Sequence, residues 1–353
     1  MPDHAHWMER CLQLARLGAS SAAPNPLVGC VLVQGDRLLA EGWHHRAGEP
    51  HAEVNCLRAF GEGPIPPDAF IYVNLEPCNH HGRTPPCTEL IIERGVKHVV
   101  IAHADPFPAV SGKGIERLRS AGVEVTVGIE EAHARWTNRR FLTSIEQGRP
   151  YIVLKWAQSA DGFLDKHPRG ERGVQRISDP ATDVLVHQWR SEEQAILVGN
   201  RTVVNDDPRL DVRHVEGRSP LRVVIDRECK TPMSSHVYDG NTPTLLFTSR
   251  VRRELPVEQF VLGLADDPID HVLAELHRRS IRSVLVEGGA ELLGHFIERG
   301  LWDEARVIAA PVQFFSGTPA PRIGKTPVRS LASGPDVIQF HVNDRSPVGE
   351  WHW

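Results

Sequence analysis

The chain has 353 residues, of which 41% are hydrophobic and 24% are charged, and these values are typical of a globular protein with about two domains. Its net charge of −5 argues against general binding to nucleic acid or to an anionic membrane surface. No stretch approaches the roughly 20 apolar residues that cross a bilayer, and the first residues lack the pattern of a secretory signal, so we expect a cytoplasmic protein.

The first half of the sequence alternates helical and strand patterns. An amphipathic helix is predicted around residues 7–15, and the runs VGCVLV and LLAEGW, joined by the turn QGDR, indicate a β-hairpin. A short helix is predicted to start at HAEVN, residues 51–55. Further elements are then expected in this order: a strand at 69–75, a helix at 87–95, a strand at 97–103, a helix at 113–122, a strand at 123–128 and a helical stretch at 130–147.

Gly and Pro at residues 148–150 interrupt the pattern, so we place a domain boundary there, with domains at 1–147 and 148–353. The second half contains several runs that are typical of buried strands, with helices between several of them: 151–157, 195–199, 221–226, 244–249, 283–289 and 304–312. Both halves are therefore expected to be α/β domains. The proline-rich residues 317–327 are expected to form a loop.

Three potential metal ligands stand in the first half. His51, Cys78 and Cys87 supply the three His or Cys ligands that a hydrolytic zinc site commonly uses, which leaves the fourth position to water. Zinc lowers the pKa of such a water to about 7. Glu53, two residues from His51, can lie beside the metal without binding it, take a proton from the water and pass it to a departing nitrogen. This pattern predicts a catalytic zinc centre.

The alternative is a structural zinc site that is closed by a fourth ligand from Cys56, His80 or His81. In that case Glu53 would be an ordinary acidic residue at the start of a helix. The cysteines are too sparse for a disulfide framework, and three of them are expected to pack as small apolar residues: Cys11, Cys30 and Cys229.

The order His-x-Glu, Pro-Cys, Cys is the signature of the zinc nucleobase deaminases. In this chain eight residues, NHHGRTPP, separate the two cysteines instead of two. With PNPLVGCVLV, HAEVN and LEPC, the neighbourhood resembles the deaminase of the bifunctional riboflavin-biosynthesis family over residues 1 to about 145. The resemblance implies a phosphorylated pyrimidine substrate, with contacts from Asn25, His44, His80 and Arg83.

The segment SVLVEGGAELLGHFIERG, residues 283–300, is typical of a strand, a glycine pair and a helix whose start could hold a phosphate. A tight strand-to-helix turn without a ligand is the alternative. Together with YIVLKWAQSADG, LVGNRTVVNDDPRLDVR and LRVVIDR, the segment resembles the reductase half of the same family over residues 150 to 353, with a fold similar to dihydrofolate reductase. The resemblance implies that NADPH reduces the ribosyl group of the deaminated pyrimidine to a ribityl chain, and that the protein is a homo-oligomer.

The same resemblance assigns residues to the two ligands of the reductase. Cofactor contacts are implied for Ala157, Thr202, Asp206, Gly289, Ala290, Glu291, Leu292, Leu293, Gly294 and His295. Substrate contacts are implied for Arg190, Leu210, Arg213 and Glu287. A guanidinium group can bind pairs of phosphate oxygens, which suits Arg190 and Arg213; surface salt bridges are the alternative.

The reductase half contains two further basic residues of interest, and it differs from the family pattern at two positions. Lys155, on an apolar strand, would be costly to bury without an acidic partner, so we expect it to face the substrate, with Asp206 or Glu287 balancing its charge; a solvent-facing lysine is the alternative. Arg227, at a strand end, could meet the extra phosphate of NADPH. The family often has Ser and Trp where this chain has Val174, a substrate position, and Arg176.

Two other functions compete with this interpretation. A nucleic-acid or free-nucleoside deaminase fused to an unrelated α/β domain would act without NADPH, but the cysteine spacing and the absence of a strongly basic surface argue against it. A noncatalytic nucleotide-sensing module with structural zinc would release no ammonia.

Overall fold

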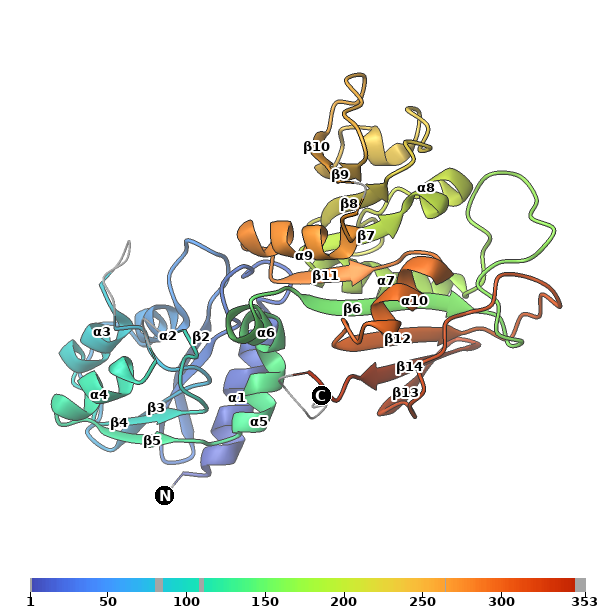
Figure 1. Ribbon diagram of the computed structural model, residues 1–353. Helices are drawn as coiled ribbons and strands as arrows, with labels where there is room; N and C mark the ends of the chain where they lie inside the picture. Colours follow the sequence, from blue (N-terminus) through green and yellow to red (C-terminus); the bar gives the residue numbers. More distant parts are fainter. Residues whose placement is uncertain (1, 80–84, 108–110, 264, 347–353) are drawn as a thin grey trace. The chain divides into compact units, whose positions relative to one another are not determined.

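The computed structural model describes residues 2–79, 85–107, 111–263 and 265–346 (Figure 1). The chain divides into two compact units, and the boundary along the chain lies between Gln147 and Gly148. Within the described ranges, every helix is too short or too polar to cross a membrane.

Unit 1 is built on a mixed sheet. Its described residues form five strands in the order β2-β1-β3-β4-β5, where β1 pairs antiparallel with β2 and β3, and β3, β4 and β5 are parallel. The strands are β1 Gly29–Gln34, β2 Arg37–Trp43, β3 Ala69–Val73, β4 His98–Ile101 and β5 Glu124–Val127. The helices are α1 His4–Arg16, α2 Ala52–Phe60, α3 Cys87–Glu93, α4 Lys113–Ser120, α5 Glu131–Thr137 and α6 Arg139–Gln147. The hairpin predicted from the sequence is confirmed as β1 and β2.

Helices cover both faces of this sheet, so strand residues of either parity are buried. Cys30 and Leu32 of β1 face a core that includes residues of α2, α3 and α4. Val31 and Val33 face the opposite core, to which α1 contributes most of its apolar residues. The result is a layered α/β/α arrangement, and the metal ligands predicted from the sequence lie on the α2 and α3 side.

The helical stretch predicted at 130–147 is two helices rather than one. The break lies at Asn138, whose side chain accepts a hydrogen bond from the backbone N–H of Leu27 at 2.7 Å and donates one to its carbonyl at 3.0 Å. Asn138 is buried and has φ −95° and ψ 15°, so this pairing with a distant loop replaces the regular helical geometry at that residue.

Unit 2 contains a larger, mainly parallel sheet. Its described part has nine strands in the order β10-β9-β8-β7-β11-β6-β12-β14-β13, and only β14 runs antiparallel to its neighbours. The strands are β6 Tyr151–Gln158, β7 Ala195–Gly199, β8 Leu221–Asp226, β9 Thr244–Thr248, β10 Glu258–Val261, β11 Ser283–Val286, β12 Glu304–Ala309, β13 Arg329–Ser333 and β14 Asp336–Val342. The helices are α7 Pro180–Glu192, α8 Asn200–Asp206, α9 Pro268–Arg278 and α10 Ala290–Glu298, with a 3-10 turn at His236–Tyr238.

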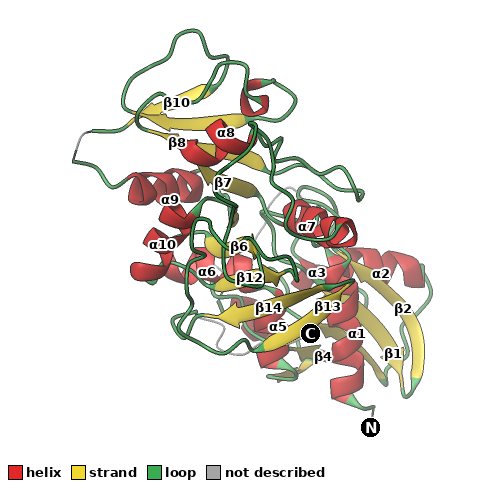
Figure 2. Ribbon diagram, turned by 90° about the vertical axis from the view of Figure 1, so that its right-hand side faces the viewer, coloured by secondary structure: helices red, strands yellow, loops and turns green. Residues whose placement is uncertain are grey.

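Figure 2 shows α9 and α10 on one side of this sheet and α7 and α8 on the other. Accordingly, Ile152 and Leu154 of β6 pack with residues of α9 and α10, whereas Val153 packs in the core that contains Val203 of α8. The proline-rich residues 317–327 form a loop, as expected, with one isolated bridge between Phe163 and Pro319. The carboxyl ends of β6, β7 and β11 lie at one edge of the sheet because these strands are parallel.

Candidate active sites

Three potential metal ligands converge where two helices of unit 1 begin. His51 is the N-cap of α2, Cys87 is the first residue of α3, and Cys78 lies in the segment after β3. The chain near Cys78 is fixed by Thr88, whose backbone N–H and hydroxyl both donate to the Cys78 carbonyl, at 3.2 and 3.3 Å. Two helix starts and one strand end therefore bring together ligands that are up to 36 residues apart.

The distances suit a tetrahedral zinc ion. With a nitrogen at about 2.0–2.1 Å and a sulfur at about 2.3 Å, such an ion requires an N–S separation of about 3.6 Å. His51 Nδ1 lies 3.6 Å from Cys78 Sγ and 3.3 Å from Cys87 Sγ. Hydrogen bonds from Cys87 and His51 lower the pKa of the Cys78 thiol to about 4, which favours the thiolate that binds metals. Among the described residues, these three ligands fit a zinc ion and leave its fourth position without a protein ligand.

Glu53 lies in the first turn of α2 and is only 4% exposed. Burial raises the pKa of its carboxyl group, and the nearby Cys78 adds to this effect. A carboxyl group with a raised pKa beside a metal site is suited to accept a proton and release it again. Glu53 is outside the cluster of close ligand atoms, which within the described residues comprises His51, Cys78 and Cys87.

Two residues assigned to the pyrimidine also lie at this site. The imidazole of His44 makes an edge-to-face contact with that of His51, with ring centroids 5.6 Å apart. Burial lowers the pKa of His44, and a neutral ring can donate from Nδ1 to the Pro50 carbonyl at 3.1 Å and accept at Nε2 from the Asn25 amide at 3.0 Å. Asn25 and His44 are therefore joined beside the metal ligands.

The structure removes one form of the closed-site alternative. Cys56 is fully buried in the core, and its thiol donates to the Ala40 carbonyl at 3.5 Å, so it is no fourth ligand. His80 and Arg83, which were assigned to the substrate, lie outside the described residues, as does His81.

Sequence reasoning missed Glu76, which holds the metal-binding segment in place. Its buried carboxylate accepts four backbone N–H groups at 2.8–3.2 Å, one from Asp105 in the loop after β4 and three at the start of α4, from Gly112, Gly114 and Ile115. A Cβ atom at Gly114 would lie 2.2 Å from the Pro77 carbonyl, so the glycine permits this close approach directly before Cys78. Glu76 is the glutamate of the LEPC motif at residues 75–78, but the motif does not indicate which backbone N–H groups its carboxylate binds.

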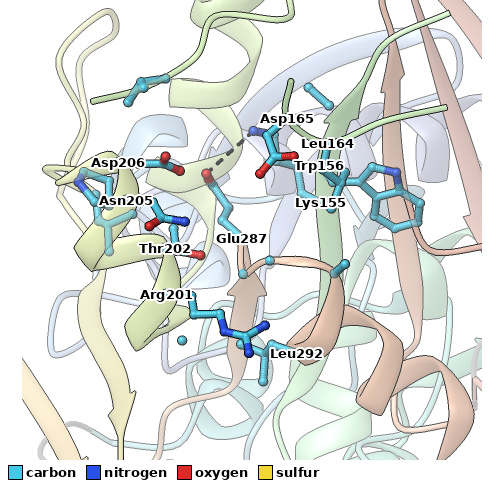
Figure 3. Close-up of a pocket in the computed structure, with 18 of the residues that line it drawn as sticks. Lys155, Trp156, Leu164, Asp165, Arg201, Thr202, Asn205, Asp206, Glu287 and Leu292 are labelled. Atoms are coloured by element: carbon cyan, nitrogen blue, oxygen red, sulfur yellow. Dashed lines mark ion pairs between the residues drawn. The ribbon is translucent and has the colours of Figure 1, made fainter. Parts of the chain in front are cut away.

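In unit 2, a cavity of about 750 Å³ opens at the carboxyl ends of the parallel strands, and this volume lies within the range of small-molecule sites. Figure 3 shows Thr202, Asn205 and Asp206 of α8 opposite Lys155 and Asp165, with Glu287 between them. Most of the residues assigned to the reductase ligands line this cavity: Lys155, Ala157, Val174, Arg190, Thr202, Asp206, Leu210, Arg213, Arg227, Glu287, Gly289, Ala290, Glu291, Leu292 and His295.

Lys155, Glu287 and Arg190 form a buried charge cluster in the cavity wall. Arg190 donates two hydrogen bonds to the Glu287 carboxylate, both at 2.8 Å, and Lys155 Nζ lies 3.6 Å from the same group. Burial opposes ionisation of Glu287, but Arg190 and Lys155 outweigh it and lower its pKa to about 2. Lys155 thus faces the cavity with Glu287, rather than Asp206, as its acidic partner, and Arg190 is already paired on one side.

The start of α10 forms another part of the wall. Gly289 is the N-cap, and a Cβ atom at Gly288 would lie 2.6 Å from Leu292 Cδ2, so a side chain there would displace Leu292 from its place in the wall. Leu292 and His295 face the cavity, whereas Leu293 is fully buried in the core below the helix and Gly294 does not line the wall. Backbone N–H groups at a helix start suit a pyrophosphate, so the wall fits a dinucleotide.

The remaining assigned residues have varied partners. Arg227 donates to the carbonyl groups of Gly263 and Asp266, both at 3.1 Å. The backbone N–H of Arg213 donates to His187 Nδ1 at 3.0 Å, and burial, with Arg190 adding to it, lowers the pKa of His187 to about 4. His187 also lines the cavity, although no motif singled it out.

The loop that departs from the family pattern, residues 171–178, contributes to the same wall. Val174 is 70% exposed, and Arg176 pairs with Asp183 at 2.9 Å. Cys11 and Cys30 are buried, as expected, but the expectation for Cys229 is wrong. Cys229 is half-buried at φ +54°, and its thiol lies 3.1 Å from the Thr248 hydroxyl, because the turn after β8 directs it towards polar groups.

Comparisons with known proteins agree with this geometry. The family "RibD C-terminal domain" matches residues 150–329, and the family "Cytidine and deoxycytidylate deaminase zinc-binding region" matches residues 1–103. The riboflavin biosynthesis protein RibD of Aquifex aeolicus is 40% identical over 92% of this chain and 91% of its own length, and that of Synechocystis is 39% identical over 98% and 94%.

A solved structure covers both units as well. The diaminohydroxyphosphoribosylaminopyrimidine deaminase/5-amino-6-(5-phosphoribosylamino)uracil reductase of Thermotoga maritima superposes with a TM-score of 0.86 at 34% identity. The superposition covers 96% of this chain and 98% of the other.

Proposed function

The chain belongs to the family of the riboflavin biosynthesis protein RibD, and on this premise we propose which of its residues carry out the two reactions of a bifunctional deaminase and reductase. The first reaction hydrolyses the amino group of 2,5-diamino-6-(5-phosphoribosylamino)pyrimidin-4(3H)-one. The second uses NADPH to reduce the ribosyl group of 5-amino-6-(5-phosphoribosylamino)uracil to ribityl. The cofactors are Zn²⁺ and NADPH.

For deamination, we assign the metal to His51, Cys78 and Cys87. When bound, the zinc ion lowers the pKa of a water molecule in the position that these three ligands leave open. Glu53 accepts a proton from the attacking water and donates it to the amino group, which leaves the pyrimidine carbon as ammonia. Asn25 and His44 orient the ring, because their hydrogen-bonded pair adjoins His51.

For reduction, we assign the cavity of unit 2 to NADPH and the sugar of the substrate. The cofactor supplies the hydride when bound. The start of α10 holds its pyrophosphate, and Thr202 lies next to that helix start, 3.8 Å from the position of a Cβ atom on Gly289. Lys155 places a cation in the cavity wall, beside Glu287, where it can donate to a sugar oxygen. Arg190 and Arg213 supply positive charge for the substrate's phosphate.

The observation that carries the proposal is the joint presence of the His51, Cys78 and Cys87 cluster, with buried Glu53 beside it, and the charged cavity at the start of α10. The roles of His80 and Arg83 rest on the family resemblance alone. The cytoplasmic location and the homo-oligomeric state stay predictions.

The proposal is tested by incubating the purified protein with the phosphoribosylamino-pyrimidine substrate and analysing the products by mass spectrometry. Without NADPH, we expect replacement of one amino group by an oxo group and release of ammonia. With NADPH, we expect the product to gain two further hydrogens. NADPH oxidation without prior deamination, or deamination that persists after complete removal of zinc, would contradict the assigned roles.

A further inference from the structure

The wall of the reductase cavity is nearly balanced in charge. Among the described residues that line it, eight are lysine or arginine and six are aspartate or glutamate. Several of these form pairs within the wall: Arg176 with Asp183, Arg190 with Glu287, and Arg201 with Glu291. Under the proposed function the cavity must accept two polyanions, NADPH and a phosphorylated substrate, so each unpaired carboxylate in the wall would weaken binding.

Arg169 forms ion pairs with two of the six carboxylates in the cavity wall. One of its terminal nitrogens forms a short ion pair with Asp206, and the other lies 3.7 Å from Asp165 Oδ2. All three side chains line the cavity and are less than one third exposed. Figure 3 shows Asp165 and Asp206 from opposite sides of the cavity, one after β6 and one at the end of α8. Asp165 also accepts a hydrogen bond from the backbone N–H of Thr318 at 2.8 Å and lies 3.4 Å from His167 Nε2. Without Arg169, both carboxylates would lose their arginine partner in the wall.

Arg169 also joins the loop after β6 to α8. It donates to the carbonyl of Gly173 at 2.8 Å and to that of Asn205 at 3.3 Å, while the backbone N–H of Gly173 donates to Asn205 at 2.8 Å. The loop that it fixes carries Val174 and Arg176, the two positions at which this chain departs from its family. The helix that it contacts carries Thr202 and Asp206, which the resemblance assigns to the cofactor.

We propose that Arg169 is a positioning residue of the reductase, which neutralises Asp165 and Asp206 and holds residues 165–178 against α8 so that the cavity accepts its two phosphorylated ligands. This role rests on the proposed reductase function. Arg169 acts through its two carboxylate partners and the loop, without contact with the reacting atoms. Its loss therefore weakens ligand binding more than it slows the hydride transfer.

Arg172 is the matched control, because it fixes the same loop to the same helix from outside the cavity. It donates to the carbonyl of Val204 and the hydroxyl of Ser235, both at 3.0 Å, and lies 3.4 Å from Asp207. Arg172 does not line the cavity. If the arginines only hold the loop in place, substitution of either should raise the KM for NADPH equally. If Arg169 neutralises the carboxylates in the cavity wall, only its substitution should do so.

The experiment compares the full-length wild type with Arg169→Gln, Arg169→Lys and Arg172→Gln in NADPH oxidation, with the deaminated substrate supplied. For Arg169→Gln we expect the KM for NADPH to rise about tenfold, with kcat reduced less than about threefold. Arg169→Lys keeps the charge and should recover part of the loss, and Arg172→Gln should stay within about twofold of the wild type. Ammonia release, which belongs to unit 1, should be unchanged in all variants. Thermal unfolding of each variant, compared with the wild type, checks that unit 2, where the substitutions lie, is folded.

Two readouts separate charge from structure. Added salt should shrink the KM difference between Arg169→Gln and the wild type, because it screens repulsion between carboxylates and phosphates. Asp165→Asn, added to Arg169→Gln, should restore part of the affinity for NADPH, because Asp165 lines the cavity and is the partner of Arg169 that is assigned to no ligand. Equal effects of Arg169→Gln and Arg172→Gln, a loss that salt and Asp165→Asn leave untouched, or a wild-type KM in Arg169→Gln would each overturn the inference. Absence of NADPH oxidation in the wild type would instead refute the proposed reductase itself.

Discussion

Replacement of Glu53 by Gln tests the proposed deamination most directly, because the amide keeps the shape of the side chain but cannot accept and return a proton. Glu53 is buried, so bulk water cannot readily take over its role, and it serves two proton transfers in one turnover. General acid–base catalysis contributes about 10²–10⁴ to a rate, and two transfers by one group favour the upper part of that range. We expect kcat for ammonia release to fall about 10³–10⁴-fold, equivalent to about 4–5.5 kcal/mol.

The assay measures ammonia release, zinc content and NADPH oxidation on the same preparation. Glu53→Gln should keep one zinc ion, because the three ligand side chains remain, and should keep NADPH oxidation when the deaminated intermediate is supplied. Glu62→Gln, an exposed acid in the loop after the same helix, should behave like the wild type. Ammonia release above about one tenth of the wild-type rate in a zinc-loaded Glu53→Gln enzyme would refute the assigned role. Loss of zinc would show that Glu53 supports the metal instead.

Three other substitutions probe both units. Cys87→Ala removes a ligand, so zinc content measured by mass spectrometry should fall well below one ion per chain and ammonia release should be lost, while retained zinc would place the metal elsewhere. Gly288→Ala would place a Cβ atom 2.6 Å from Leu292 Cδ2, so Leu292 must shift within the cavity wall and the KM for NADPH should rise about tenfold; an unchanged KM would contradict a role of Leu292 in cofactor binding. Glu287→Gln leaves Lys155 and Arg190 without their carboxylate, so the free energy of unfolding should fall by about 3 kcal/mol at pH 7. The folded-state pKa of Glu287, about 2, is below its ordinary value of 4.5, so the stabilisation by its carboxylate is present above pH 4.5 and is lost as the pH falls towards 2. In urea unfolding, the difference in stability between the wild type and Glu287→Gln should therefore narrow in acid. A difference that stays constant with pH would contradict this.

The metal centre could be predicted from the sequence because zinc restricts ligand type and number, and His51, Cys78 and Cys87 satisfy both. The partner of Lys155 could not be chosen between Asp206 and Glu287. The choice depends on strand register: β6 and β11 are parallel neighbours with Leu154 opposite Val286, which brings the next residues, Lys155 and Glu287, side by side.

Contacts that depend on loop conformation escaped prediction entirely. Nothing in the sequence indicates that Arg169 pairs with Asp165 and Asp206, because the path of the loop decides which atoms meet. The β13 and β14 strands were also missed, since β13 is largely exposed and shows no apolar alternation. The break at Asn138 depends on a hydrogen bond to Leu27, more than 100 residues away.

Cys78 and Cys87 lie together although eight residues separate them, so a metal ion bound there would clamp both ends of the intervening segment. Closing a chain of eight rather than two residues costs only about 1.2 kcal/mol more, because the entropy of closure grows with the logarithm of length. Substitutions or insertions in this segment therefore cost the metal site little, and its length can vary while the three zinc ligands keep their places.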